Sequence, residues 1–280
     1  MGGSWSIEAA HPLHGGITGI VAAVDLRNST GKRRRLVLKL YRPEPQEPDS
    51  AWREAHVLQL LGQSELPVPR VVAIDRDGSE TEWPALLMVR MPGRRRMQPK
   101  DPMPWLLGLA SLARGIHEEP IQPQLLPSYR PWGLDGSLLQ PPWWTDGDVW
   151  QRAVEIVRSP APAEPKTFIH RDYYAGNVLW SGARASAIVD WLHGCWGPAS
   201  VDVAHCRLNL WLDHGPHFAD VWLDAYKQIR PAAEPHHPYW DLVDAMGWVI
   251  DPACHGWRRA RRHQEFVSAA VARLTSQAQT

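Results

Sequence analysis

The chain has 280 residues, more than one ordinary core needs and fewer than three domains take, so the length favours two lobes. Its 30 basic and 30 acidic side chains give a formal net charge of zero, which argues against nucleic acid or an anionic membrane as a partner. No run approaches the roughly 18 apolar residues of a membrane span, and the N-terminus lacks the basic-then-apolar order of a signal peptide.

The N-terminal third predicts a small antiparallel β-sheet with one helix. Asn28-Ser-Thr-Gly31 is a turn signal between two apolar runs and predicts a hairpin. A helix is expected over residues 50–61, with Ser50 capping its start and Gly62 ending it. Met91-Pro-Gly93 is expected to be a hinge. The expected strands lie near 5–8, 17–26, 35–41, 67–74 and 84–90.

The rest of the chain is predicted to be mainly helical. Between residues 120 and 165 it is rich in Pro and Trp, and we expect an irregular insertion whose tryptophans are buried. Short apolar runs at 168–169 and 187–189 lie on either side of a polar loop. The expected fold class is α+β, with a small β-rich lobe at 1–92 and a larger, mainly helical lobe at 93–280. Helices are expected near 105–117, 149–158, 202–211, 217–229, 239–250 and 258–274.

The most informative segment is His170-Arg-Asp-Tyr-Tyr-Ala-Gly-Asn177, which Asp190 follows thirteen residues later. Phosphoryl transfer needs a carboxylate at the attacking hydroxyl and hard oxygen ligands for Mg²⁺, which Asp and Asn supply. Asp172 and Asn177 have the spacing of the kinase catalytic loop, and Asp190 stands where its metal-binding Asp is expected.

Five segments in the same order resemble the aminoglycoside phosphotransferase and choline kinase-like family, whose two-lobe fold is similar to that of protein kinases. The similarity runs from about Gly15 to Ala204. The matching segments are Leu36-Val-Leu-Lys39, Arg53-Glu54, Pro67-Val-Pro-Arg70 with Leu86–Gly93, His170–Trp180 with Ile188-Val-Asp-Trp191, and Gly197–Ala204.

The resemblance implies a role for each matching residue. Lys39 would contact the α- and β-phosphates of ATP, and Glu54 would hold Lys39. Asp172 would act as catalytic base at the acceptor hydroxyl, and Asn177 and Asp190 would bind Mg²⁺. The smaller lobe would bind the nucleotide, and the larger lobe would be the catalytic and substrate-binding one. The implied activity is transfer of the γ-phosphate of ATP to a hydroxyl of a small molecule, such as an aminoglycoside-like antibiotic, an amino alcohol or a sugar.

Other parts of the family pattern match less fully. Asp202 would support the catalytic loop from a helix. Tyr174-Ala175 stands where relatives often have His-Pro, and Arg171 where Gly is frequent, which leaves the substrate side of the loop open. Gly15 and Gly16 are candidates for a phosphate-binding turn, with an ordinary hairpin turn as the alternative.

Two alternative functions are weighed against this one. A protein kinase would have Phe-Gly after the metal-binding Asp, where this chain has Trp191-Leu192, and no Ala-Pro-Glu closes an activation loop. A non-catalytic, ATP-binding pseudokinase would lack at least one of Lys39, Asp172, Asn177 and Asp190, and all four are present.

The remaining candidates concern metals, thiols and the acceptor. His193, Cys195, His205 and Cys206 do not reproduce the spacing of a zinc site. The three cysteines favour reduced thiols, and we expect a cytoplasmic protein. The acceptor is expected between the catalytic loop and the C-terminal helices, where acidic residues favour a cationic amine and the basic run Arg258–Arg262 opposes it. The oligomeric state is not predicted.

Overall fold

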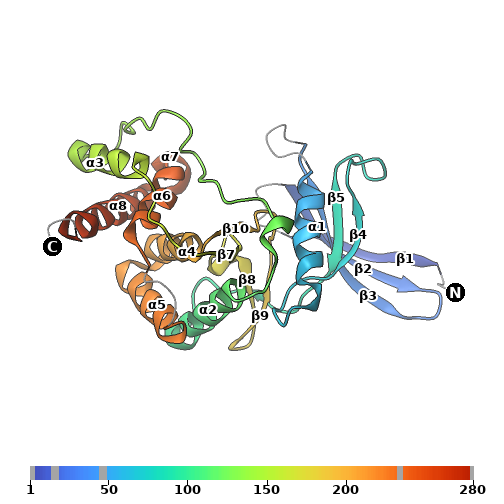
Figure 1. Ribbon diagram of the computed structural model, residues 1–280. Helices are drawn as coiled ribbons and strands as arrows, with labels where there is room; N and C mark the ends of the chain where they lie inside the picture. The colour runs from blue at the N-terminus through green and yellow to red at the C-terminus, as the bar shows by residue number, and fades with distance from the viewer. Residues whose placement is uncertain (1–3, 14–18, 44–48, 232–235, 278–280) are drawn as a thin grey trace. The chain divides into compact units, whose positions relative to one another are not determined.

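The computed structural model describes residues 4–13, 19–43, 49–231 and 236–277 (Figure 1). The chain forms two compact units, the first made of Met1–Arg94 and Val178–Gly194 and the second of Arg95–Asn177 and Cys195–Thr280. Packing therefore places the segment 178–194 with the N-terminal unit. The division into functional lobes at 1–92 and 93–280 stays a prediction.

The first unit is built on a five-stranded antiparallel sheet in the order β1-β2-β3-β5-β4. The turn between β2 and β3 forms as the sequence predicts, because the Asn28 side chain accepts hydrogen bonds from the amides of Thr30 and Lys32, and Gly31 takes a positive φ of 82°. The strands are β1 (Trp5–Pro12), β2 (Gly19–Asn28), β3 (Arg33–Tyr41), β4 (Val71–Asp75) and β5 (Ala85–Val89).

Helix α1 (Ser50–Leu60) packs against β3, β4 and β5, and Figure 1 shows it beside the sheet. The helix begins at Ser50 and ends at Leu60, close to the expected range 50–61, but both predicted caps are wrong. Asp49, not Ser50, occupies the N-cap position, and no side chain caps it; Ser50 is already helical and buried against the unit. Gly62 does not end the helix in a left-handed turn, because the chain tightens into the 3-10 helix η1 (Leu61–Gln63), which buries Leu61.

The segment 178–194 adds the hairpin of β8 (Val178–Ser181) and β9 (Arg184–Ile188), and β6 (Arg94–Arg95) pairs with β8. Gly93 approaches this hairpin closely with a φ of 105°. A Cβ at this position would lie 2.4 Å from Ser186 Oγ and 2.8 Å from the carbonyl oxygen of Trp180. The predicted hinge therefore requires glycine for both its φ and its lack of a side chain.

Gly93→Ala is expected to destabilise the protein more than Gly182→Ala, the matched control in the β8–β9 turn. Both residues have a positive φ, which costs an alanine roughly 1–2 kcal/mol, but a Cβ on Gly182 meets nothing within 4 Å. Overpacking at Gly93 adds about 1–3 kcal/mol to the loss of unfolding free energy. Urea denaturation of the two variants measures the difference, and equal losses would show that the close approach of Gly93 is unimportant.

The second unit is mainly helical, with α4 at its centre, packed against α2, α5, α6 and α8. Trp105, Trp222 and Phe266 are fully buried in this core. A two-stranded antiparallel sheet of β7 (Lys166–Ile169) and β10 (Cys195–Pro198) flanks the catalytic loop segment. The helices are α2 (Pro102–His117), α3 (Gly147–Arg158), α4 (Ala199–His214), α5 (Pro216–Ile229), α6 (Pro238–Gly247), α7 (Pro252–His255) and α8 (Trp257–Gln277).

Between α2 and α3 the chain is irregular apart from the 3-10 helix η2 (Pro123–Leu125), as its composition predicts. Trp144 from this stretch and Trp150 at the start of α3 are buried and pack edge to face, and Trp144 also contacts the ring of His263 on α8. The prediction that tryptophans hold the insertion against the core is confirmed for these two. Among the described residues, none of the helices has the length and apolar character needed to cross a membrane.

Candidate active site

In the first unit, Lys39 is held between two carboxylates. It lies on β3 with its side chain only 6% exposed, and its Nζ is 2.7 Å from Glu54 Oε2 and 2.6 Å from Asp190 Oδ1. Burial disfavours the ammonium, but the charges of Glu54 and Asp190 outweigh it and raise the pKa of Lys39 above its usual value. The contact expected between Lys39 and Glu54 is present, and Asp190 completes a buried ion triad.

Glu54 is buried in α1 and satisfied on both oxygens. Its Oε2 accepts a hydrogen bond of 2.5 Å from the Tyr41 hydroxyl, and its Oε1 accepts one of 3.3 Å from the backbone amide of Trp191. Burial and the Glu54 charge raise the pKa of Tyr41 well above its usual value, so the phenol stays a donor. Glu54 thereby connects β3, α1 and the segment that carries Asp190.

Asp190 has a φ of 68°, a left-handed conformation that is costly for a residue other than glycine. The following amide, that of Trp191, is anchored on Glu54, and the Trp191 ring is fully buried with its Nε1 donating to the carbonyl of Ile188. The Asp190 side chain keeps 31% of its surface exposed. One carboxylate oxygen of Asp190 binds Lys39, and the side chain remains accessible to a cation.

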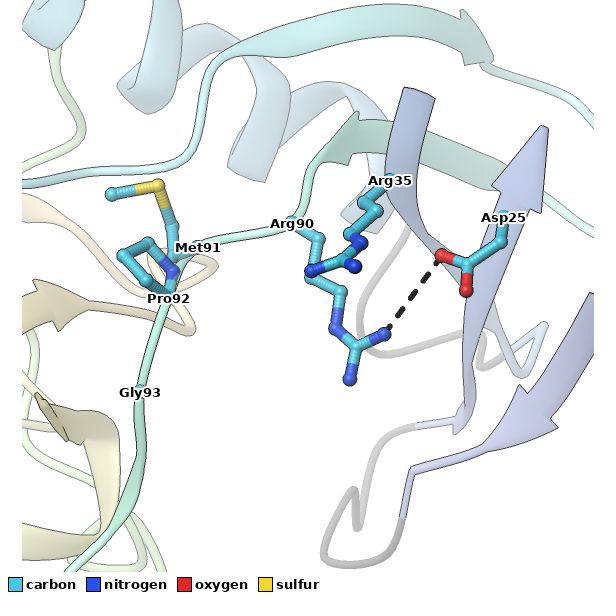
Figure 2. Close-up of a pocket in the computed structure, with 6 residues that line it drawn as sticks. All are labelled: Asp25, Arg35, Arg90, Met91, Pro92 and Gly93. Carbon is cyan, nitrogen blue, oxygen red and sulfur yellow. Dashed lines mark ion pairs between the residues drawn. The ribbon is translucent and has the colours of Figure 1, made fainter. Parts of the chain in front are cut away.

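A cavity of about 520 Å³ opens beside the sheet, lined in part by Asp25, Arg35 and Arg90 (Figure 2). Arg35 precedes Lys39 by four residues on β3. Because alternate residues of a strand point to the same face of the sheet, both side chains lie on one face. Asp25 pairs with Arg35 across the strands, and its Oδ1 lies 4.0 Å from Arg90 Nη1. Met91–Gly93, the hinge, completes the lining.

In the second unit, the catalytic loop is fixed by Asp202 on α4. Its Oδ2 accepts a hydrogen bond of 2.8 Å from the amide of His170, and its Oδ1 accepts one of 2.6 Å from the amide of Arg171. Asp202 also lies 3.1 Å from His117 Nε2. These bonds hold Arg171 at a φ of 69°. The supporting role inferred for Asp202 is confirmed.

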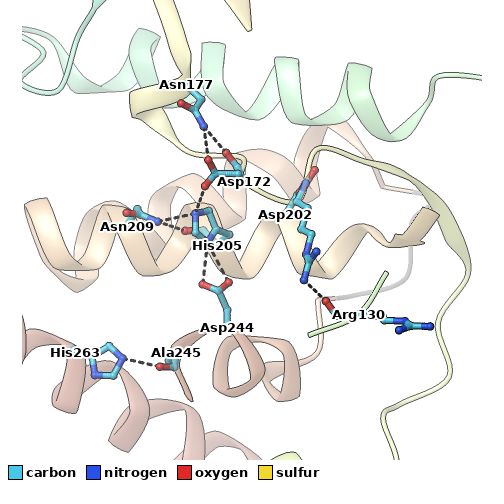
Figure 3. A network of polar contacts seen from close by, with 10 residues as sticks. Arg130, Asp172, Asn177, Asp202, His205, Asn209, Asp244, Ala245 and His263 are labelled. Carbon is cyan, nitrogen blue, oxygen red and sulfur yellow. Dashed lines mark hydrogen bonds and ion pairs between the residues drawn. The ribbon is translucent and has the colours of Figure 1, made fainter. Parts of the chain in front are cut away.

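Asp172 receives a donor on each carboxylate oxygen. Asn177 Nδ2 lies 2.8 Å from its Oδ2, and His205 Nε2 lies 3.0 Å from its Oδ1 (Figure 3). Burial raises the pKa of Asp172, but the hydrogen bond and charge of His205 outweigh it and lower that pKa below its usual value. Asn177 Nδ2 also donates to the carbonyl of Asp172, so the amide of Asn177 turns its Oδ1 away from this carboxylate.

The sequence patterns indicated His205 only as a possible zinc ligand and did not predict its contact with Asp172. His205 lies on α4, and its Nδ1 is 3.0 Å from Asp244 Oδ1 on α6. A signal was available, because His205 follows Asp202 by three residues and therefore lies on the same face of α4. Asp244 is far from these residues in the sequence, and nothing in the pattern distinguished it from the other C-terminal acids.

Gly15 and Gly16 lie outside the described residues. Gly19 begins β2 so close to β3 that a Cβ would lie 1.9 Å from the carbonyl oxygen of Leu40. In the part of the chain that the structure describes, no group of three or more His, Cys, Asp or Glu side chains is placed to hold a metal ion. The donors offered by Asn177 and Asp190 are a carbonyl and a carboxylate oxygen, the chemistry that Mg²⁺ prefers when phosphate oxygens complete its shell.

The first unit holds a lysine buried between two carboxylates, and the second unit holds a loop with Asp172 and Asn177; both features match the residue pattern of kinase-type phosphotransferases. The chain belongs to the phosphotransferase enzyme family, whose sequence pattern matches residues 24–263. The resemblance inferred from the motifs is thereby confirmed.

The homoserine kinase of Pseudomonas aeruginosa strain UCBPP-PA14 is 31% identical over 204 residues. That match covers 66% of this chain and 62% of the relative. A thermostable mutant of aminoglycoside phosphotransferase APH(4)-Ia, in a ternary complex with AMP-PNP and hygromycin B, superposes with a TM-score of 0.66 at 17% identity, over 95% of this chain and 94% of that one.

A third relative is the macrolide 2'-phosphotransferase MphH from Brachybacterium faecium. It superposes with a TM-score of 0.57 at 15% identity, over 94% of this chain and 91% of that one. At such identities the two structural likenesses establish the fold. The α+β, protein-kinase-like fold expected from the sequence is confirmed.

Proposed function

We propose that this protein is a phosphotransferase that moves the γ-phosphate of ATP to a hydroxyl of a small molecule, with Mg²⁺ as cofactor. One observation carries the proposal: the buried Lys39 ammonium lies 2.7 Å from Glu54 and 2.6 Å from Asp190. A buried cation beside a half-exposed carboxylate, with the hinge cavity beside the same sheet, suits a nucleotide whose phosphates need both a cation and a metal.

Each residue has a proposed task. Lys39 contacts the α- and β-phosphates, and Glu54 keeps Lys39 in place. Asn177 and Asp190 hold Mg²⁺, which neutralises charge that develops on the phosphate oxygens. Asp172 orients the acceptor hydroxyl and takes its proton as the hydroxyl oxygen bonds to the γ-phosphorus and the bond to the ADP leaving group breaks. Gly15 and Gly16 remain candidates for backbone contacts to phosphate.

The charges of the second unit bear on the acceptor. Most of its described C-terminal acids are matched by cations of the same unit, so little negative charge is left to attract a polycation. We therefore rank neutral or singly charged amino alcohols and sugars above polycationic aminoglycosides. The pairs are Asp213 with Arg259, Asp220 with Arg273, Asp241 with Arg207, and Asp244 with His205.

Two further features belong to the proposal. The three cysteines are free thiols, and Cys195 and Cys206 are buried, which suits a reducing compartment, and we propose the cytoplasm. Inactivation of an antibiotic is one use of the proposed reaction, and phosphorylation of a metabolite is the other.

Mg-ATP is expected to raise the melting temperature of the protein by several degrees. A ligand that binds only the folded state stabilises it by about 2.7 kcal/mol at a concentration 100 times its Kd. Differential scanning fluorimetry with ATP, with and without Mg²⁺, measures this shift. ADP formation is then followed with homoserine, choline, amino sugars, aminoglycosides and macrolides as acceptors. No thermal shift at millimolar Mg-ATP, or no acceptor-dependent ADP, would contradict the proposal.

A further inference from the structure

His205 is placed between two carboxylates, one on each ring nitrogen. Nε2 lies 3.0 Å from Asp172 Oδ1, and Nδ1 lies 3.0 Å and 3.2 Å from the two oxygens of Asp244 (Figure 3). Ionised carboxylates only accept hydrogen bonds, so each ring nitrogen carries a proton when Asp172 and Asp244 are both charged. The geometry therefore defines an imidazolium cation that joins α4 to the catalytic loop on one side and to α6 on the other.

The surroundings of His205 agree with this charge. Burial opposes protonation, but Asp244 and Asp172 outweigh it and raise the pKa of His205 well above its usual value. Other titratable groups also lie near these residues. The charge of His170 acts on Asp172, the charge of Asp244 acts on Tyr129 and on His263, and Tyr174 contacts the His205 ring.

Aromatic rings limit the freedom of the imidazole. Trp132 and Tyr174 meet it edge to face, with ring centroids 6.2 Å and 5.8 Å away, and its side chain is only 16% exposed. Asn209, one turn further along α4, donates to the carbonyl of His205, and its Nδ2 also lies 3.3 Å from the ring nitrogen Nε2 of His205. The ring is thus held by contacts from the insertion, the loop and its own helix.

The orientation of Asp172 depends on two donors. The terminal torsion of an aspartate is broad and roughly two-fold, so the backbone alone does not set the plane of its carboxylate. Asn177 binds Oδ2 at 2.8 Å and His205 binds Oδ1 at 3.0 Å, and together they define that plane. Helix α4 therefore contacts the loop at two points. Asp202 binds the loop backbone, and His205 binds the side chain of Asp172.

We propose that His205, backed by Asp244, is a positioning residue that holds the Asp172 carboxylate in the orientation in which it meets the acceptor hydroxyl. This role rests on the proposed phosphotransferase function. Helix α6 takes part in this role, because its Asp244 carboxylate sets the orientation and the charge of the His205 imidazole.

His205→Gln is expected to lower kcat by about 10- to 100-fold, because misplacement of a catalytic group costs rate. The KM for ATP should stay unchanged, since His205 acts on the acceptor side. In the Asp172→Asn background the same change should have little further effect, because the group that His205 positions is gone. Asp244→Asn is expected to lower kcat in the same direction and less severely, since the neutral amide still accepts a hydrogen bond.

His263→Gln is the matched control. His263 is a buried histidine on α8 whose Nε2 lies 2.9 Å from the carbonyl oxygen of Ala245, next to Asp244 (Figure 3). Its loss should reduce stability and leave kcat close to wild type. If His205→Gln and Asp172→Asn act additively in an active enzyme, or if His205→Gln changes only stability as His263→Gln does, the positioning role is wrong while the proposed function stands.

A second measurement needs no acceptor. In protein with ¹⁵N-labelled histidine, the His205 ring, assigned by its loss in His205→Gln, should show two protonated nitrogens at pH 7.5. In Asp244→Asn the neutral fraction should increase. A neutral His205 ring in the wild-type protein overturns the proposal whatever the activity, whereas an imidazolium in a protein that transfers phosphate to no acceptor contradicts the proposed function instead.

Discussion

Asp190→Asn is expected to remove phosphotransfer and to abolish the increase in ATP affinity that Mg²⁺ produces. The substitution is close to isosteric, and Asn tolerates the left-handed φ of 68° better than most residues, so the backbone should be preserved. It removes one of the two carboxylates on Lys39 and the proposed anionic ligand of Mg²⁺. Calorimetric titration of ATP with and without Mg²⁺ measures the metal dependence directly.

Asp49→Asn provides the control for this experiment. Asp49 belongs to the same unit, has a similar φ of 63° and is also ion-paired, to Arg76, but it is exposed at the start of α1. Its replacement should leave both activity and the effect of Mg²⁺ unchanged. A persistent metal effect in Asp190→Asn would exclude Asp190 as a ligand of the nucleotide-bound metal.

Asp172→Asn is expected to lower kcat by roughly 10²–10⁴-fold, the usual contribution of a general base. Nucleotide affinity and its dependence on Mg²⁺ should change little, because Asp172 is proposed to contact the acceptor hydroxyl. Asp213→Asn is a matched control, since Asp213 is also a partly buried carboxylate of the second unit paired with a cation, Arg259. Comparison of turnover with the same ATP titrations separates the two tasks. If Asp172→Asn loses the metal effect and Asp190→Asn keeps it, the two assignments are reversed.

Local patterns were sufficient for most elements of the fold and for selecting the candidate site residues. The turn at Asn28–Gly31, the strand of Lys39 and the helix of Glu54 depend on short-range chemistry, and the structure contains all three. The caps of α1 were predicted wrongly, because capping rules treat a helix in isolation, whereas Ser50 and Leu61 are buried against the rest of the unit.

The sequence alone determined which residues form the candidate loop. Asp172, Asn177 and Asp190 lie in one short stretch, and their order and spacing are those of a kinase loop. The partners of these residues were decided only by the tertiary structure. Asp172 contacts His205, which lies 33 residues later in the chain, and His205 in turn contacts Asp244. Those contacts depend on the packing of α4 against α6 and against the loop, and hydrophobic periodicity predicts that helices bury a face without predicting which polar side chains their packing brings together.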